Sequence, residues 1–391
     1  MAIEGKDDGV AGGRIRLGMV GGGEGAFIGA VHRLAARMDD HYDFVAGALS
    51  ATPDKAIRSG AALGLDPRRA YGSYEEMAAR ERRLRDGIEA VAIVTPNHMH
   101  APAARAFLRA GIHVICDKPL TTTLKEARAL AAAAEKAGVI FAVTHNYTGY
   151  PLVRHARAMV RAGELGEIRV VQVEYAQDWL TEKLEESGQK QADWRTDPAR
   201  SGAGGCIGDI GTHAFNLADF VTGLDVAELS AELTTFVPGR RLDDNVQVTL
   251  RYANGARGAL WASQVAVGNE NALQLRVYGT KGGLTWRQEN PNELFFAPFG
   301  KPTQIITRGG AGAGPEAARM TRIPPGHPEG YLEGFANIYG EVAAAIRAAR
   351  SGKPAPKEVT FPTVADGVKG LSFIETAVKS SAKGGAWTRM L

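Results

Sequence analysis

The sequence RIRLGMVGGGEGAFIGAVH, residues 14–32, combines three local patterns in a fixed order. A short apolar run typical of a β-strand is followed by a cluster of glycines and then by the apolar spacing of an α-helix. A dinucleotide site requires this order, because the backbone must turn sharply, approach a pyrophosphate closely and direct free helix N–H groups at its charge. Gly21 and Gly23 fit the first two roles, although a glycine turn without a ligand is the alternative at this point.

The third small residue of this turn has two interpretations. Ala26 has the spacing G-x-G-x-x-A, whereas Gly29 is the packing glycine if the turn carries a three-residue insertion. We favour the insertion. Phe27 and Ile28 are also predicted to contact a cofactor.

The next strand-like run, DFVAGALS at 43–50, ends where an acidic residue usually binds the ribose hydroxyls of the cofactor. Here that residue is Ser50. Without a carboxylate a 2′-phosphate is not rejected, and Lys55 or Arg58 in the following turn could bind one. Both NAD and NADP are therefore open, with NAD slightly favoured.

Three further strand-like runs alternate with Ala-rich helical sequence. This alternation predicts an α/β fold with a doubly wound parallel sheet, whose ligand crevice lies at the carboxyl ends of its strands. The motifs at those ends are TPNHMH at 95–100, CDKP at 116–119 and THNY at 144–147.

Length and composition limit the class of protein. A chain of 391 residues favours two domains, and 45% hydrophobic with 23% charged residues is typical of a globular protein. A formal charge of +3 without a basic stripe argues against nucleic acid as a partner, and no apolar run is long enough for a membrane span. Cys116 and Cys206 indicate neither a disulfide framework nor a zinc site, which favours the cytoplasm. Residues 1–13 are predicted to be a disordered lead-in.

Four motifs, in order and spacing, resemble those of the glucose-fructose oxidoreductase, inositol dehydrogenase and rhizopine-catabolism family of NAD(P)-dependent oxidoreductases. The resemblance covers nearly the whole chain from Arg14. It implies a Rossmann domain at 14–148, then an α/β substrate-binding and oligomerisation domain at 149–391 with a large, open, mostly antiparallel sheet and C-terminal helices. The motifs are GGGEGAFIGAVH at 21–32, TPNHMH, CDKPL at 116–120 and SGAGGCIGDIGTHAFN at 201–216.

The chain departs from the family's pattern at two positions. Asp117 stands where the family usually has Glu, which keeps the charge, and Ser50 replaces the frequent ribose-binding acid. The change at Asp117 puts little of the resemblance in doubt, whereas Ser50 leaves the choice between NAD and NADP open.

The second half of the sequence agrees with an open sheet. Its β-like runs are separated by turn residues, and helical sequence returns at 329–350 and 363–381. The Gly-rich stretch at 308–320 is expected to be a mobile loop. Because an open sheet with an exposed apolar face usually needs a cover, we expect a homodimer or homotetramer joined through it.

The motif GDIGTHAFN at 208–216 places Asp209 and His213 four positions apart, which stacks them on one face of a helix. The resemblance implies that both residues and Lys118 surround the reacting carbon of a substrate alcohol, and that a cis peptide at Pro119 turns the lysine into the crevice. Hydride leaves carbon only as the hydroxyl proton is taken up, and His213 is the natural base. The carboxylate of Asp209 can orient the imidazole or share a substrate hydroxyl, and Lys118 can stabilise alkoxide charge. The alternative is a helix cap at Asp209 and a core histidine at His213.

The remaining site residues follow from the strand ends and from sugar chemistry. His100 could instead cap the next helix, and Trp179 and Trp194 are the predicted substrate contacts most readily explained as core. Aromatic faces suit sugar C–H groups, while polar side chains hold hydroxyls. No metal is implied. The predicted cofactor contacts here are Thr95, Pro96, Asn97, His100, Asp117 and Lys118, and the predicted substrate contacts are Asn146, Tyr147, Asp178, Trp179, Trp194, Arg195 and His327.

Three functions fit the sequence. The leading hypothesis is an NAD(P)-dependent dehydrogenase that oxidises one ring carbinol of a sugar, sugar derivative or cyclitol to a ketone. The second is an oxidoreductive glycosidase, which oxidises C3 transiently, eliminates the aglycone, adds water and returns the hydride. The third is a non-catalytic dinucleotide-binding regulator, which has no need of a positioned base.

Overall fold

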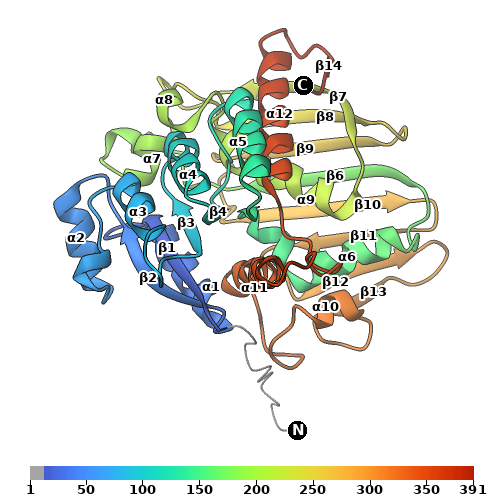
Figure 1. Cartoon of the computed structure of the whole chain (residues 1–391). Coiled ribbons are helices and arrows are strands. Elements are labelled where there is room, and N and C mark those ends of the chain that lie inside the picture. The colour runs from blue at the N-terminus through green and yellow to red at the C-terminus, as the bar shows by residue number, and fades with distance from the viewer. Residues whose placement is uncertain (1–12) are drawn as a thin grey trace.

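The computed structural model describes residues 13–391, so the predicted lead-in lies outside the described residues except for Gly13. The strands form one sheet of five and one of nine. Figure 1 shows the five-stranded sheet in the N-terminal part of the chain and the nine-stranded sheet beside it. The predicted α/β fold, with one parallel and one mostly antiparallel sheet, is confirmed.

The five-stranded sheet is parallel throughout, with the order β2-β1-β3-β4-β5. The strand order reverses between β1 and β3, which is the point where open α/β sheets bind ligands. All five residues of β3, AVAIV, are buried, as expected for a strand covered on both faces. The strands are β1 (Ile15–Gly21), β2 (Tyr42–Ala48), β3 (Ala90–Val94), β4 (His113–Cys116) and β5 (Phe141–Val143).

Five helices connect and flank these strands. In the last of them, the Thr123 side chain accepts a hydrogen bond from the backbone N–H of Glu126, and Gly138, with φ of 63°, ends the helix. These helices are α1 (Phe27–Met38), α2 (Pro53–Ala62), α3 (Tyr74–Glu81), α4 (His100–Arg109) and α5 (Leu124–Ala137).

In the nine-stranded sheet, whose order is β13-β12-β11-β10-β6-β9-β8-β7-β14, all neighbours are antiparallel except β6 and β9. Side chains alternate across it: Val171, Val173 and Tyr175 are buried, whereas Gln172 and Glu174 between them are half-buried. The strands are β6 (Ile168–Ala176), β7 (Val226–Thr234), β8 (Asn245–Tyr252), β9 (Arg257–Ser263), β10 (Ala272–Gly279), β11 (Gly282–Arg287), β12 (Glu293–Pro298), β13 (Gln304–Thr307) and β14 (Thr388–Arg389).

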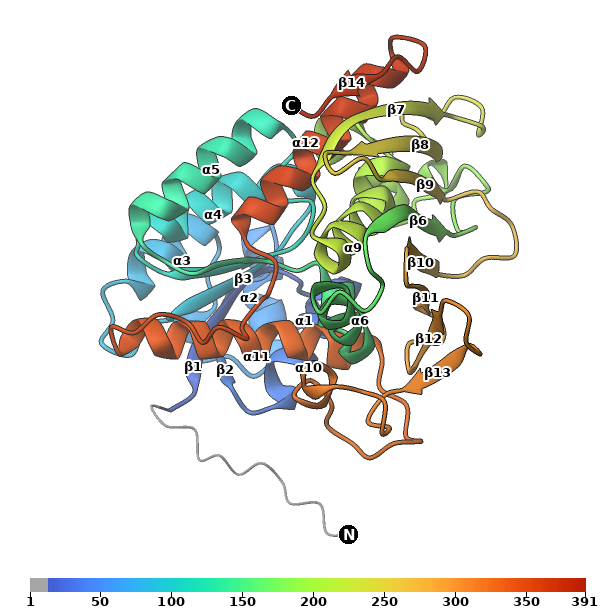
Figure 2. The same ribbon diagram turned by 90° about the vertical axis from the view of Figure 1, so that its right-hand side faces the viewer.

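Helices lie on one face of this sheet. Figure 2 shows α12, α9 and α6 on the same side of its strands. The long helix α11 packs instead against α1, where Phe335 and Ile338 share a core with Leu17 and Met19 of β1. The C-terminal part of the chain therefore completes the cover of the first sheet. The remaining helices are α6 (Pro151–Arg161), α7 (Lys190–Arg195), α8 (Pro198–Ser201), α9 (Thr212–Thr222), α10 (Pro315–Ala318), α11 (Tyr331–Arg350) and α12 (Val364–Ser381).

The stretch at 308–320 differs from the expected mobile loop. It contains α10, the Arg308 side chain is buried, and Arg319 forms ion pairs of 2.8 Å with both Glu316 and Glu341. The expectation of mobility came from the glycine content alone. In the structure Arg308 and Arg319 hold the segment in place through ion pairs with Glu329 and Glu341.

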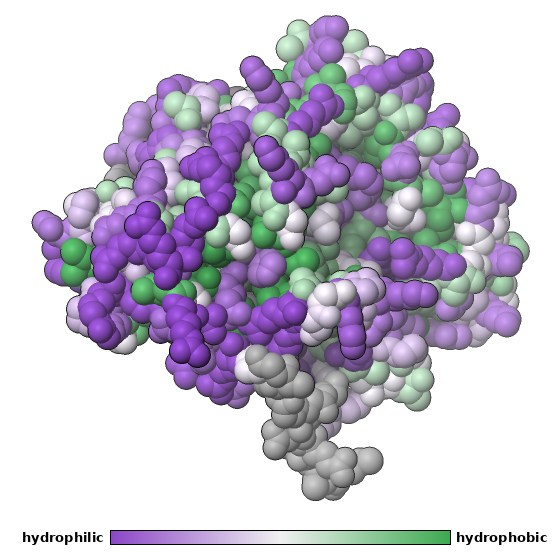
Figure 3. Space-filling model, viewed as in Figure 1, coloured by the Kyte–Doolittle hydropathy of each residue, from purple (hydrophilic) through white to green (hydrophobic). Residues whose placement is uncertain are grey.

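The surface and the cysteines add little to the choice of function. Hydrophilic residues cover most of the face in Figure 3, with smaller apolar areas between them. In the part of the chain that the structure describes, no helix has the length and apolarity needed to cross a membrane. Cys116 and Cys206 are both free and buried, and residues 13–391 contain no cluster of three or more His, Cys, Asp or Glu suited to a metal ion.

Candidate active site

The register of the parallel sheet aligns the ends of four strands. Gly21 of β1 pairs with Val94 of β3, and Cys116 of β4 pairs with Val143 of β5. The residues that follow these strands therefore meet at one edge of the sheet. A cleft of about 1100 Å³ lies there and reaches across to the nine-stranded sheet.

The glycine turn and the start of α1 form one end of this cleft. Gly21 and Gly22 have φ of 79° and 72°, a region that favours glycine. A Cβ on Gly29 would lie 2.3 Å from the Cα of Gly22, so Gly29 is the glycine that packs against the turn, as the insertion predicts. Within the described residues no side chain caps the first turn of α1, and that turn carries no acid. Its free N–H groups suit a phosphate.

The cleft fits a nicotinamide dinucleotide along its length. Thr95 Oγ1 and Asn146 Nδ2 are buried and have no hydrogen-bond partner among residues 13–391, which leaves them for a polar ligand. At the far end, beyond β2, Ser50, Lys55 and Glu75 line the wall. Of the predicted cofactor residues, the structure places these in the lining: Gly21, Gly23, Phe27, Ile28, Ser50, Thr95, Pro96, Asn97, Asp117 and Lys118.

His100 does not line the cleft. It begins α4, is fully buried, and its Nδ1 and Nε2 lie 2.8 Å from the Pro119 carbonyl and 2.9 Å from the Thr95 carbonyl. Burial lowers the pKa of His100. The neutral imidazole therefore lies between the carbonyls of Thr95 and Pro119 and can donate to one of them. The sequence could not separate this position from direct cofactor contact.

Lys118 is held at the centre of the cleft. The Lys118–Pro119 peptide is cis, as the resemblance implied. Lys118 Nζ donates hydrogen bonds to the backbone carbonyl of Asp209 (2.6 Å) and to its Oδ1 (2.8 Å). Asp117 Oδ1 accepts from the Lys118 backbone N–H and from the Thr144 hydroxyl. An ammonium group has three donors, so Asp209 leaves one of them for a substrate.

Asp209 lies on a π-helical turn, Ile207–Gly211, which leads into α9. Such turns recur at functional sites. Asp209 Oδ2 accepts a hydrogen bond from Gln264 (2.9 Å) and lies 3.2 Å from Arg195 Nε. Burial raises the pKa of this carboxyl, but the charges of Lys118 and Arg195 outweigh burial and hold the pKa well below its ordinary value. Asp209 is therefore an ionised carboxylate between two cations.

His213 lines the same cleft and is surrounded by aromatic rings. Its ring centroid lies 4.9 Å from that of Tyr147 and 5.6 Å from that of His145. Burial, then the charge of Lys118, lowers the pKa of His213 well below its ordinary value. The expectation that Asp209 orients this imidazole is not met: the carboxylate is occupied by other groups, and Nδ1 of His213 has no hydrogen-bond partner in the described chain.

A hydrogen-bonded network forms the wall opposite the cofactor end. Tyr175 donates to Asn271 Oδ1 (2.6 Å), and its hydroxyl lies 2.6 Å from that of Tyr147. Gln177 also donates to Asn271 Oδ1 (2.8 Å), and Asn271 donates to Gln288 Oε1 (2.9 Å). Sequence reasoning found Tyr147 and missed the other four.

The other predicted substrate residues divide into two groups. Trp179 and Trp194 are half-buried and line the cleft rather than the core, and the Arg195 guanidinium lies 4.2 Å from the Trp194 ring centroid. Asp178 and His327 lie outside the lining. The Asp178 carboxylate accepts a hydrogen bond from the Gly268 N–H, and His327 lies in a second hollow.

Comparison with known families agrees with this site. Residues 15–145 match the model of an oxidoreductase family with an NAD-binding Rossmann fold, and residues 153–285 match the GFO/IDH/MocA C-terminal domain. The chain belongs to the GFO/IDH/MocA family of oxidoreductases. It is an NAD(P)-dependent enzyme with an NAD-binding Rossmann domain, of a class whose members include sugar and inositol dehydrogenases.

Individual relatives match along nearly their whole length. An uncharacterized oxidoreductase of Bacillus subtilis, YfiI, is 34% identical over 95% of this chain and 96% of the relative. Levoglucosan dehydrogenase of Pseudarthrobacter phenanthrenivorans is 30% identical over 95% and 97%. Among solved structures, an inositol dehydrogenase homolog complexed with NAD⁺ from Azotobacter vinelandii is 37% identical, with a TM-score of 0.93 over 97% of this chain and 98% of that one.

Proposed function

We propose that this enzyme oxidises a ring carbinol of a sugar, sugar derivative or cyclitol to a ketone. The observation that carries the proposal is a single cleft that joins the glycine turn to Lys118, Asp209 and His213. Relatives support the substrate class: one is a levoglucosan dehydrogenase, and a homolog from A. vinelandii, 36% identical, was solved with NADH and myo-inositol.

In this proposal His213 takes the hydroxyl proton. Because burial lowers its pKa, the imidazole is neutral at neutral pH, and a neutral imidazole has one ring nitrogen able to accept a proton. The unpartnered Nδ1 shows that no described side chain competes for the ring at that atom.

Lys118 stabilises the developing alkoxide. Two of its N–H groups are fixed by Asp209, and the third donates to the substrate oxygen. Asp209 remains a carboxylate, so its part is to hold the ammonium in place rather than to exchange a proton. When bound, the nicotinamide ring supplies the acceptor for the hydride.

The test is an incubation of the purified protein with NAD⁺ or NADP⁺ and a panel of free sugars, myo-inositol, levoglucosan and aryl glycosides. Absorbance at 340 nm and aglycone release are followed together. A steady rise at 340 nm on a free sugar, anhydrosugar or cyclitol supports the proposal, whereas aglycone release without a net rise indicates the glycosidase. Neither signal, with cofactor binding intact, would contradict both.

We propose NAD as the preferred cofactor. The structures of similar proteins were solved with NAD⁺ or NADH. Ser50 and Lys55 line the end of the cleft where a 2′-phosphate would lie, so the preference is expected to be modest. The ratio of kcat/KM for the two cofactors measures it.

We also propose that two or four copies join through the face of the nine-stranded sheet opposite α12, α9 and α6 (Figure 2). Trp261, on that sheet, is half-buried in the single chain. Sedimentation as a monomer at micromolar concentration would contradict this arrangement.

The two free cysteines support the cytoplasm as the location.

A further inference from the structure

A second hollow of about 1100 Å³ adjoins the active-site cleft. It lies where three loops meet, at 268–271, 288–293 and 326–331. Asn271, Gln288 and Tyr331 line both spaces. Gln288 also donates a hydrogen bond to the Tyr150 hydroxyl, 3.3 Å away, so hydrogen-bonded polar side chains lie where the two spaces meet.

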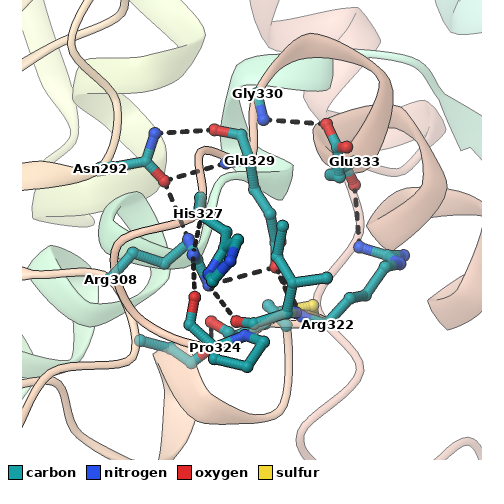
Figure 4. Close-up of polar contacts among 12 residues, drawn as sticks. Asn292, Arg308, Arg322, Pro324, His327, Glu329, Gly330 and Glu333 are labelled. Atoms are coloured by element: carbon teal, nitrogen blue, oxygen red, sulfur yellow. Dashed lines mark hydrogen bonds and ion pairs between the residues drawn. The ribbon is translucent and has the colours of Figure 1, made fainter. Parts of the chain in front are cut away.

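The outer wall of this hollow is firmly built. Arg308 pairs with Glu329 at 3.1 Å, and both side chains are buried. The other donors of Arg308 go to Asn292 Oδ1 and to the backbone carbonyls of Ile323, Pro324 and His327. Asn292 in turn binds both backbone groups of Glu329. Figure 4 shows these residues converging around the loop that leads into α11. A preformed wall of this kind is typical of a binding site.

The lining chemistry is that of a hydroxyl-binding surface. The Glu329 side chain is buried behind this lining: Oε1 accepts three hydrogen bonds, and Oε2 has no hydrogen-bond partner among the described residues. Tyr331 contributes a half-buried aromatic ring, which suits the C–H face of a sugar, whereas the Tyr150 ring is buried behind the lining. The polar side chains of the lining also include Asn269, Glu270, Glu289, Asn290, Glu293 and His327.

We propose that this hollow binds a second hydroxylated ring, so that the preferred substrate is a disaccharide or a glycosylated cyclitol rather than a single ring. This inference rests on the proposed function, because the first ring lies at Lys118 and His213. The second ring then contacts Asn271 and Gln288, which line both spaces. In this proposal His327, which lines the hollow, contacts the second ring.

The test compares matched pairs of one-ring and two-ring compounds: levoglucosan with cellobiosan, and myo-inositol with galactinol. Binding to the NADH-loaded protein is measured by titration calorimetry, and kcat/KM is measured wherever a compound is oxidised. We expect at least one two-ring compound to bind, and to react, at least about tenfold better than its partner. One-ring compounds that match or exceed both two-ring compounds would overturn the proposal.

The variant Asn290→Trp fills the hollow from the turn between β11 and β12, at a position that does not itself line the active-site cleft. It should reduce the ratio of two-ring to one-ring affinity at least about tenfold. Asn254→Trp, in the turn between β8 and β9 at the opposite end of the sheet, is the matched control and should leave the ratio as in the wild type. An unchanged ratio in Asn290→Trp overturns the subsite. If no compound is oxidised, the proposed function fails, while calorimetry still decides the subsite.

Discussion

Two ion pairs at the loops of this enzyme differ in whether the cation keeps a hydrogen-bond donor without a protein partner. In Arg308–Glu329 the side chains are 2% and 1% exposed, and all five N–H groups of the arginine are donated to protein oxygens. In Lys118–Asp209 the side chains are 12% and 15% exposed, and one lysine donor is left over. The first pair stabilises the loops around the second hollow, and the second pair lines the active-site cleft.

The two pairs differ in exposure and in whether the cation keeps a spare hydrogen-bond donor, and both differences favour Lys118 over Arg308 as the group that faces a ligand. Asp209 is surrounded by Lys118, Arg195 and Gln264, so it stays ionised, while His213 beside it has an unpartnered Nδ1. Buried polar groups in proteins are ordinarily paired, so atoms without partners at a cleft point to a ligand.

Removal of the lysine ammonium should have the largest effect. Lys118→Ala is expected to lower kcat/KM by on the order of 10³, because the alkoxide loses its cation and Asp209 loses a partner. Lys369→Ala is the matched control, since Lys369 pairs with Asp219 at 3.2 Å on the surface. Steady-state kinetics measure kcat/KM for both variants. Equal losses of kcat/KM in the two variants would contradict a special role for Lys118.

Removal of the arginine should act on stability instead. Arg308→Met leaves Glu329 buried without its cation, and the free energy of unfolding should fall by about 3–5 kcal/mol. The control is Arg251→Met, which breaks the half-exposed pair with Glu228 and should cost under about 1 kcal/mol. Denaturant unfolding measures both. A stable Arg308→Met protein would show that the wall does not depend on this pair.

The pH dependence of kcat/KM should report His213. Its active form is neutral, and burial lowers its pKa well below the ordinary value of 6.5, so activity should persist below pH 6.5 and fall only as the imidazole gains a proton. Asp209 contributes no limb near neutrality, because its pKa is held well below its ordinary value. The residual activity of His213→Gln should lack this acidic limb. A midpoint at or above 6.5 in the wild type argues against His213 as the base.

The smallest expected effect concerns the cofactor. Ser50→Asp places a carboxylate at the end of β2, where it accepts from ribose hydroxyls and repels a 2′-phosphate. The preference for NAD over NADP should rise about tenfold. A fall in that preference would show that the adenosine ribose does not lie at Ser50.

Local patterns in the sequence predicted the first sheet, because strand ends and glycine turns are encoded by neighbouring residues, whereas the resemblance to a known family supplied Lys118, Asp209 and His213. The contact of Arg195 with Asp209 could not be predicted, since it depends on α7 folding over the cleft. Asn271 and Gln264 were missed for a related reason: they join the site only because β9 and β10 flank β6 in the sheet.

The residues at the end of β6 and just after it differ in their relation to the cleft: Tyr175, Gln177 and Trp179 stand two positions apart, with Asp178 between the last two. All three line the cleft, and Asp178 does not. The π-helical turn at Ile207–Gly211, by contrast, has no signal in the spacing of Asp209 and His213.

The most direct measurement is a single turnover with a ring-deuterated substrate, either myo-inositol or levoglucosan, and oxidised cofactor in the wild type and in Lys118→Ala. Mass spectrometry then locates the deuterium. We expect the wild type to transfer one deuterium to the nicotinamide and to release a ketone, and we expect transfer in Lys118→Ala to be slower by on the order of 10³. Deuterium that stays on the sugar carbon in the wild type, or transfer at an equal rate in the variant, would contradict it.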